Sequence, residues 1–169
     1  MAGPQQLRAE RYTFARSAIT MWALIGGGVL VCVVLVNAYS ILAGAIVNRP
    51  FPGDFELTEM GVAIAAFCFL PYCQLRGSNV SADIFTAAAG PRAIAAMSVF
   101  SATIAILFSA LLIWRMSHGL SDYIEYAEIT GILSIPIWWA FVPALISLVL
   151  LSVASIISFI EALDKLQRP

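Results

Sequence analysis

The fold is decided by the stretch WALIGGGVLVCVVLVNAYSILA, residues 22–43, which contains no charged residue. It belongs to a longer uncharged interval of 32 residues between Arg16 and Arg49. A helix rises about 1.5 Å per residue, so roughly 20 apolar residues cross the hydrocarbon layer of a bilayer. The stretch therefore predicts a transmembrane helix. It is longer than the apolar part of a signal peptide, about 7–15 residues, so we expect an uncleaved first span.

Three further uncharged intervals follow this one. They hold 16 residues before Arg76, 22 before Arg115 and 32 before Glu161. The shortest reaches spanning length when residues 57–59 are added to it. We therefore predict four spans, at residues 22–43, 57–75, 94–114 and 136–160. The runs are apolar on all faces, which excludes the alternating strands of a membrane β-barrel and leaves soluble helices without a polar surface.

Composition agrees with a membrane protein. The 169 residues are 61% hydrophobic and only 11% charged, whereas soluble domains are about half apolar and about a quarter charged. A net charge of −1 provides no field that would attract nucleic acid. We expect an all-α integral membrane protein that forms a single domain over residues 1–169.

The distribution of Lys and Arg predicts the orientation. Because four spans place both termini on one side, seven of the nine basic residues fall on that side: Arg8, Arg11, Arg16, Arg76, Arg92, Lys165 and Arg168. The positive-inside rule makes this side cytoplasmic. The two outward loops are then acidic, around Glu56 and around Glu125, and simple solvation or contact with a partner protein would suit them equally.

The segment SNVSADIFTAAA, residues 78–89, is too polar to span a membrane. Its apolar residues Val80 and Ile84 recur at helical spacing, and Gly90-Pro91 follows. We predict a short helix along the cytoplasmic interface, with a plain loop as the alternative.

Several residues mark the outer ends of the spans. Trp114, Trp138 and Trp139 suit a membrane–water interface. Pro136 is expected in the first turn of the fourth helix, where its missing N–H costs little, and Ser134 is expected to cap that helix.

The sequence offers no catalytic or cofactor chemistry. His118 is the one histidine and is expected in an outward loop, which excludes a bis-histidine haem site. The three cysteines, Cys32, Cys68 and Cys73, have no metal-ligand or disulfide spacing and are interpreted as small buried hydrophobic residues. No Ser–His or Ser–Lys pair at membrane depth and no phosphate-binding loop is present. We expect no enzyme activity, no cofactor and no metal.

Polar residues inside the spans are few. Asn37 and the serines of the fourth span, Ser147, Ser152, Ser155 and Ser158, are expected to form hydrogen bonds between helices. The triplet Gly26-Gly27-Gly28 permits close helix approach, and Pro71 and Pro143 are expected to kink their helices.

Glu59 is the ionisable residue nearest to a membrane interior. A self-sufficient small proton-coupled transporter could use such a carboxylate, and this remains an alternative function. Its place near the outer boundary favours a structural or partner-binding role.

Two motifs carry a family resemblance. Glu59 enters the second span, and LRGSNVSADIF, residues 75–85, follows it with Arg76, Gly77 and Asp83. LSIPIWW, residues 133–139, precedes the last span. Together with the four spans, these resemble the small membrane subunit (DctQ type) of tripartite ATP-independent periplasmic (TRAP) transporters. In that family one residue usually separates the arginine from the glycine, whereas here Gly77 follows Arg76 directly. Histidine is frequent in the family at the position of Asn79.

The resemblance implies a function and partners. The large membrane subunit (DctM type) would hold the substrate and sodium sites and move as an elevator. A periplasmic binding protein would deliver an organic acid to it. This chain would be the non-catalytic scaffold in the bacterial inner membrane. Its expected contacts with partner or lipid are Glu59, Arg76, Gly77, Asp83, Trp138 and Trp139.

Overall fold

The computed structural model describes residues 13–76 and 91–167. These residues form four long helices: α2 (Thr13–Val47), α3 (Asp54–Arg76), α5 (Pro91–Glu125) and α6 (Trp138–Gln167). All four are long and apolar enough to cross a membrane, as the sequence predicts. The interfacial helix expected over residues 78–89 lies outside the described residues, as do Gly77 and Asp83.

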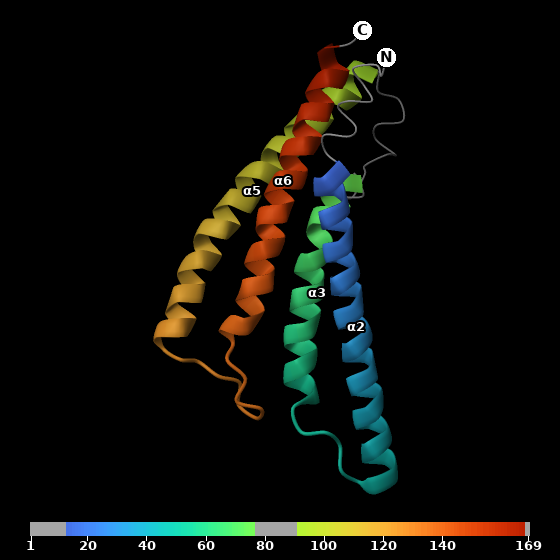
Figure 1. Ribbon diagram of the computed structural model, residues 1–169, viewed down its shortest axis with the longest axis vertical. Coiled ribbons are helices and arrows are strands. Elements are labelled where there is room, and N and C mark those ends of the chain that lie inside the picture. Colours follow the sequence, from blue (N-terminus) through green and yellow to red (C-terminus); the bar gives the residue numbers. More distant parts are fainter. Residues whose placement is uncertain (1–12, 77–90, 168–169) are drawn as a thin grey trace.

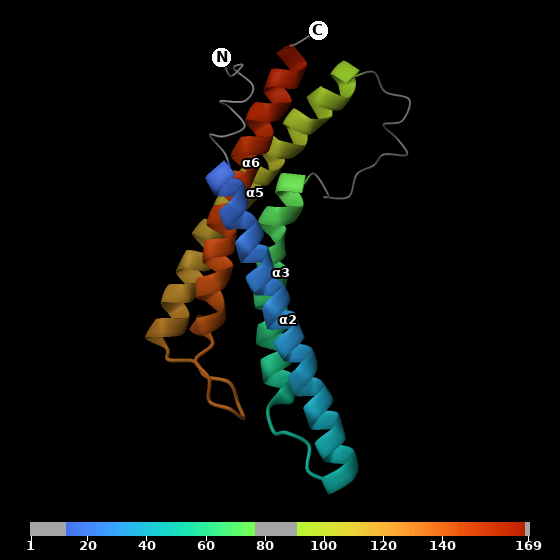
Figure 2. The same cartoon turned by 45° about the vertical axis from the view of Figure 1, so that its right-hand side comes forward.

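The helices form two antiparallel hairpins, α2–α3 and α5–α6 (Figure 1). α6 packs against both α5 and α3, α3 packs against α2, and α2 makes a smaller contact with α6. The hairpins converge toward the end where α2 and α5 begin, and they separate toward the opposite end, which we call the loop end (Figure 2). α6 is therefore the central helix.

Small residues line the contacts between helices. The fully buried side chains include Ala65 and Cys68 of α3 and Ala154 of α6, and Gly26 of α2 and Gly61 of α3 are buried beside them. Small side chains let helix backbones approach closely, which is how helices associate where lipid removes the hydrophobic driving force.

α2 and α5 extend beyond their predicted spans. Each has 35 residues, which corresponds to about 52 Å at 1.5 Å per residue and exceeds the roughly 30 Å hydrocarbon layer. His118 and Arg115 were expected in a loop but lie in α5, so that expectation is wrong. Charged residues mark where the chain leaves the hydrocarbon layer. The helix can continue beyond that point, because it satisfies its own backbone hydrogen bonds in water as well as in lipid.

The turn between α2 and α3 has identifiable stop and start signals. Asn48 adopts φ 53°, and the Arg49 N–H bonds to the carbonyl of Ala43, which closes α2 with a left-handed residue. Gly53 adopts φ 93°, and its carbonyl accepts the N–H of Leu57 in the first turn of α3.

The loop between α5 and α6, residues 126–137, folds back on itself. The Thr130 N–H donates to the Ile135 carbonyl, and the Ile137 N–H donates to the Glu128 carbonyl. This pairing keeps Pro136 in an isolated bridge with Ile129. α6 begins only at Trp138, so the expectation that Pro136 starts the helix is wrong.

Ser134 was expected to cap α6, and this is also wrong. It adopts φ 54° within the folded loop, four residues before the helix begins.

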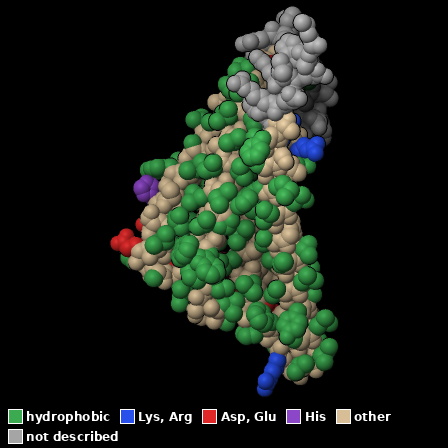
Figure 3. All heavy atoms as spheres, in the orientation of Figure 1, with side chains coloured by type: hydrophobic (Ala, Val, Ile, Leu, Met, Phe, Trp, Pro, Cys, Tyr) green, Lys and Arg blue, Asp and Glu red, His purple; other side chains and the backbone are tan. Residues whose placement is uncertain are grey.

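The outer surface is apolar over most of its extent. Figure 3 shows hydrophobic side chains covering the visible face, with acidic atoms gathered at the loop end of α5. Large exposed hydrophobic residues occur on all four helices, including Leu24, Leu70, Leu107 and Val149. Cys32 is also exposed, whereas Cys68 is buried, so the expectation of burial is wrong for Cys32.

Candidate functional site

Polar side chains tie the helices together at three levels, and the first level is the loop end of α2–α3. The Ser40 hydroxyl donates to Asp54 Oδ2 at 2.6 Å and accepts the Phe51 N–H at 3.1 Å. One turn deeper, Asn37 Nδ2 donates to Thr58 Oγ1 at 2.6 Å and to the Val33 carbonyl at 2.9 Å. The prediction that Asn37 bonds between helices is confirmed.

Glu56 joins the two hairpins at the same end. Its carboxylate accepts the Ile132 N–H at 2.7 Å and the Leu133 N–H at 2.9 Å. Beside it the Leu133 side chain packs so closely against Gly53 that a Cβ there would collide with it. Glu56 was expected in an outer loop, either solvated or in contact with a partner protein, but it lies in α3 and binds the chain's own 126–137 loop.

The second level lies near the middle of the helices. Trp22 Nε1 of α2 donates to Ser147 Oγ of α6 at 2.8 Å, and this oxygen lies 3.8 Å from Cys68 Sγ of α3. Three helices therefore meet at one serine. Gly26 belongs to the same crossing, because a Cβ there would lie 2.5 Å from the Cβ of Cys68.

A separate hydrogen bond at depth joins α5 to α6. Ser152 Oγ lies 3.0 Å from Ser109 Oγ, and Ser109 is fully buried. Ser147 and Ser152 thus confirm the prediction of interhelical bonding. Ser155 does not, because its buried hydroxyl has no hydrogen-bond partner among the described residues.

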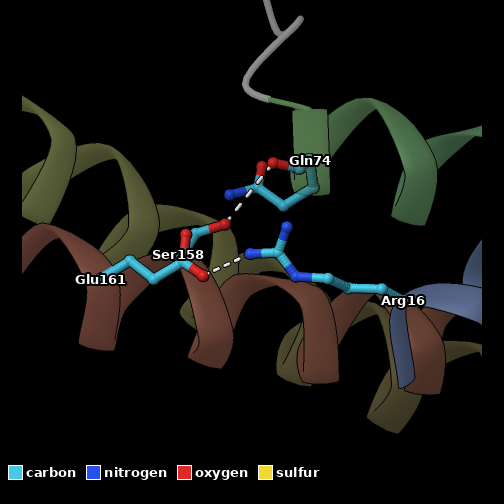
Figure 4. A network of polar contacts seen from close by, with 4 residues as sticks. All are labelled: Arg16, Gln74, Ser158 and Glu161. Carbon is cyan, nitrogen blue, oxygen red and sulfur yellow. Dashed lines mark hydrogen bonds and ion pairs between the residues drawn. The ribbon is translucent and has the colours of Figure 1, made fainter. Parts of the chain in front are cut away.

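The third level lies near the start of α2 and the end of α6 (Figure 4). The Arg16 guanidinium of α2 pairs with the Glu161 carboxylate of α6, and Ser158 Oγ bonds to the Gln74 carbonyl of α3 at 3.5 Å. The view shows these four side chains grouped where α2, α3 and α6 converge. Because Arg16 and Glu161 are about half exposed, their pairing contributes little stability on its own.

Glu59 differs from all of these. It is exposed on α3 and makes no hydrogen bond or ion pair with any described residue. Asp54 and Glu56, on the same two turns of helix, are both engaged inside the chain. The carboxylate that the sequence singled out is therefore the one that faces away from the protein.

Arg76 lies at the opposite end of α3 and is held by its neighbour Tyr72. Its Nε donates to the Tyr72 hydroxyl at 3.1 Å, and its guanidinium carbon lies 5.4 Å from the centre of that ring. The guanidinium is exposed. No described residue bonds its terminal N–H groups, so they suit an external anion.

Comparison of the sequence with known protein families identifies the family of this chain. Residues 33–165 match the family model described as tripartite ATP-independent periplasmic transporters, DctQ component. The chain belongs to the DctQ family. The match includes α3, α5, most of α6 and the later part of α2, whereas Arg16 and Trp22 of α2 lie before it. No curated protein and no solved structure matches the chain significantly.

As a member of the DctQ family, the chain is the small permease component of a TRAP transporter. Its predicted contact residues are not gathered in one place. Glu59 and Arg76 lie at opposite ends of α3, while Trp138 and Trp139 begin α6, with ring centres 6.2 Å apart. Within residues 13–76 and 91–167, no three His, Cys, Asp or Glu side chains are grouped to hold a metal ion.

Sequence reasoning missed Glu56 and Trp22 as residues that join helices in this DctQ protein. Glu56 lies among acidic neighbours and looked like part of a solvated loop. Trp22 lies at the start of an apolar run, where its indole N–H gives no sign of a distant acceptor. Neither partner is near in sequence, since Glu56 bonds 76 residues away and Trp22 bonds 125 residues away.

Proposed function

We propose that this TRAP component is a non-catalytic scaffold for the large, elevator-type membrane subunit. It serves sodium-coupled uptake of an organic acid that a periplasmic binding protein delivers. Both termini are cytoplasmic, and the membrane is the bacterial inner membrane. In this role the chain binds neither the substrate nor sodium.

One observation supports the scaffold role more than any other. Most of the polar side chains described at depth are used in contacts between or within the helices. Asn37, Trp22, Ser147 and Ser152 all bond to other residues of the chain. A transport site needs polar groups that face a cavity and exchange partners. Polar groups that already bond within the chain make it rigid instead, which is what a static element requires.

An elevator requires one part to stay in place while another slides. Three levels of interhelical contact suit the stationary part, because they resist relative movement of α2, α3 and α6. The broad apolar surface of the four helices offers area for contact with lipid and with a large partner.

Reconstitution into liposomes tests the scaffold role. Candidate organic acids, namely dicarboxylates, 2-oxo acids and sialic acids, are first ranked by the thermal shift they cause in the binding protein. Sodium-driven uptake of the best acid should require the large subunit, this chain and the binding protein together. Uptake at the full rate without this chain would contradict the proposal.

Glu59 provides the alternative function, because an exposed carboxylate near a helix end could exchange protons. Liposomes containing only this chain separate the two functions. Under the scaffold proposal they show no acid uptake and no proton-coupled efflux. Transport by the isolated chain that is lost in Glu59→Gln would establish the alternative.

Arg76 has a proposed role at the cytoplasmic end of α3. Because Tyr72 holds its Nε, its remaining N–H groups are positioned to bind a lipid phosphate. Arg76→Gln should reduce the amount of anionic phospholipid that copurifies with the chain, as measured by native mass spectrometry. Arg115→Gln, at the other end of the molecule, is the control. Unchanged lipid in Arg76→Gln would contradict this role.

The other predicted contact residues keep their proposed roles. Gly77 and Asp83 belong to the expected cytoplasmic interfacial segment. Trp138 and Trp139 are proposed to lie at the outer interface, where an amphipathic ring is favoured.

A further inference from the structure

The outward surface of α3 is a narrow stripe. It consists of six exposed residues that repeat every three or four positions: Phe55, Glu59, Val62, Ala63, Ala66 and Leu70. At 100° per residue these positions fall within one sector of about 100°. Residues facing the protein, such as Gly61, Ala65 and Cys68, lie on the other side. We call this surface the α3 stripe.

Five of the six residues are apolar, and Glu59 is the exception. A carboxylate in such a setting is costly where it faces hydrocarbon. The helix N-terminus does not account for it, because the favourable dipole effect is confined to the first turn and Glu59 is the sixth residue of α3. Phe55, with 74% of its surface exposed, lies one turn closer to the loop end on the same side.

No described residue compensates this charge. Among the described residues Glu59 has no hydrogen bond and no ion pair, whereas Asp54 and Glu56 are both bonded. The carboxylate is therefore open to a partner outside the chain. Positive charge is the complement of a carboxylate, and Arg or Lys supplies it most strongly.

The shape of the stripe also suits a second helix. Ala63 and Ala66 are one turn apart and carry small side chains, so another backbone can approach α3 closely there. Val62 and Leu70 flank them with larger apolar side chains that are 45% and 39% exposed.

We propose that the α3 stripe docks a transmembrane helix of the large TRAP subunit, and that this helix presents an Arg or Lys to Glu59. This inference rests on the proposed function, since it identifies the surface through which the scaffold holds its partner. The outward stripe of α6, which includes Ile146 and Val149, has no charge and serves as the comparison surface.

Photo-crosslinking in the assembled complex tests the docking surface. A photoreactive amino acid is placed at Val62 or Ala66 on the α3 stripe, and at Ile146 or Val149 on α6, during coexpression with the large subunit. Crosslinks to the large subunit from Val62 and Ala66 are expected. Their absence, with or without crosslinks from α6, would overturn the proposal.

Charge substitution tests the partner's chemistry. Glu59→Gln should reduce the yield of copurified large subunit several-fold. Glu125→Gln, which removes an exposed carboxylate at the loop end of α5, should not. In the isolated chain Glu59→Gln should leave the unfolding midpoint unchanged, because the side chain makes no hydrogen bond or ion pair with any described residue. A wild-type yield from Glu59→Gln would overturn the cationic partner and leave Glu59 as a carboxylate solvated at the lipid headgroups.

A charge swap identifies the partner residue. Glu59→Lys should abolish copurification, and replacing one Arg or Lys of the large subunit by Glu should restore it. Failure of every such replacement would contradict the ion pair. If the wild-type proteins copurify and support sodium-driven uptake but crosslink elsewhere, only this inference fails. If the wild-type chain neither binds the large subunit nor supports uptake, the proposed function fails with it.

Discussion

Single residues with the same chemistry have different roles in this protein. Asp54, Glu56 and Glu59 lie within six residues, yet the first closes the α2–α3 turn, the second holds a distant loop and the third faces outward. The difference follows from helix geometry, because each residue turns 100° from the last. The role of a glycine or serine near the core depends in the same way on which side of its helix it occupies.

The three consecutive glycines of α2 provide a test of close packing. A Cβ at Gly26 would lie 2.5 Å from the Cβ of Cys68, whereas Gly27 has nothing within 4 Å. Gly26→Ala should destabilise the chain by about 1–3 kcal/mol, because overpacking forces α2 and α3 apart. Unfolding in mixed micelles with increasing SDS measures this. Gly27→Ala is the matched control and should be neutral; equal effects of the two substitutions would refute the close approach.

Two serines of α6 provide a test of hydrogen bonding at depth. Ser147→Ala leaves the Trp22 indole N–H without its acceptor and should cost about 0.5–2 kcal/mol, the range for interhelical hydrogen bonds. Ser155→Ala removes a buried hydroxyl that has no partner among the described residues, so it should be neutral or stabilising. The same SDS titration compares them. A larger loss from Ser155→Ala than from Ser147→Ala would contradict the assignment.

At the scale of elements, the loop between α5 and α6 is bound to the first turn of α3. The 126–137 loop reaches α3, where Glu56 binds it through two backbone N–H groups. This contact links the α5–α6 hairpin to the α2–α3 hairpin at the end where the helices separate.

Removing that carboxylate should free the loop. In Glu56→Ala, the amides of Ile132 and Leu133 lose their acceptor, so their hydrogen–deuterium exchange should become faster. Exchange in the middle of α6 should be unchanged. Glu125→Ala removes an exposed carboxylate that makes no hydrogen bond or ion pair with any described residue, and it should leave the exchange of both amides unchanged. Slow exchange of Leu133 in Glu56→Ala would show that another group holds the loop.

At the scale of the whole molecule, the helices converge toward the end where α2 and α5 begin and separate toward the loop end. α6 occupies the centre and meets every other helix. The arrangement leaves large apolar surfaces exposed on α2, α3 and α5. Exposed apolar surface of this kind is suited to packing against a partner protein in the same membrane.

The orientation of this arrangement can be measured by cysteine labelling. In a variant without the three native cysteines, Glu125→Cys should react with a membrane-impermeant maleimide in cells whose outer membrane has been permeabilised. Gln5→Cys should react only after the inner membrane is disrupted. The positive-inside distribution predicts this result. Labelling of Gln5→Cys in intact spheroplasts would reverse the proposed topology.

Sequence patterns determined which segments form the four long helices and that these are membrane helices. Long uncharged runs carry that information locally, because a helix satisfies its own backbone hydrogen bonds and needs only apolar side chains to enter lipid. The same patterns indicated the family through residues near Glu59 and Trp138. They did not locate where α5 ends or that α6 begins after Pro136, because helix ends outside the hydrocarbon depend on capping and on the fold of the adjoining loop.

Only the tertiary structure decided which polar residues meet. The contacts Glu56–Leu133, Trp22–Ser147 and Arg16–Glu161 join residues 77, 125 and 145 positions apart. No local pattern specifies them, because they depend on the order in which α2, α3 and α6 pack and on the direction each side chain takes. That packing is also what separates Glu59 from its acidic neighbours and leaves it facing outward.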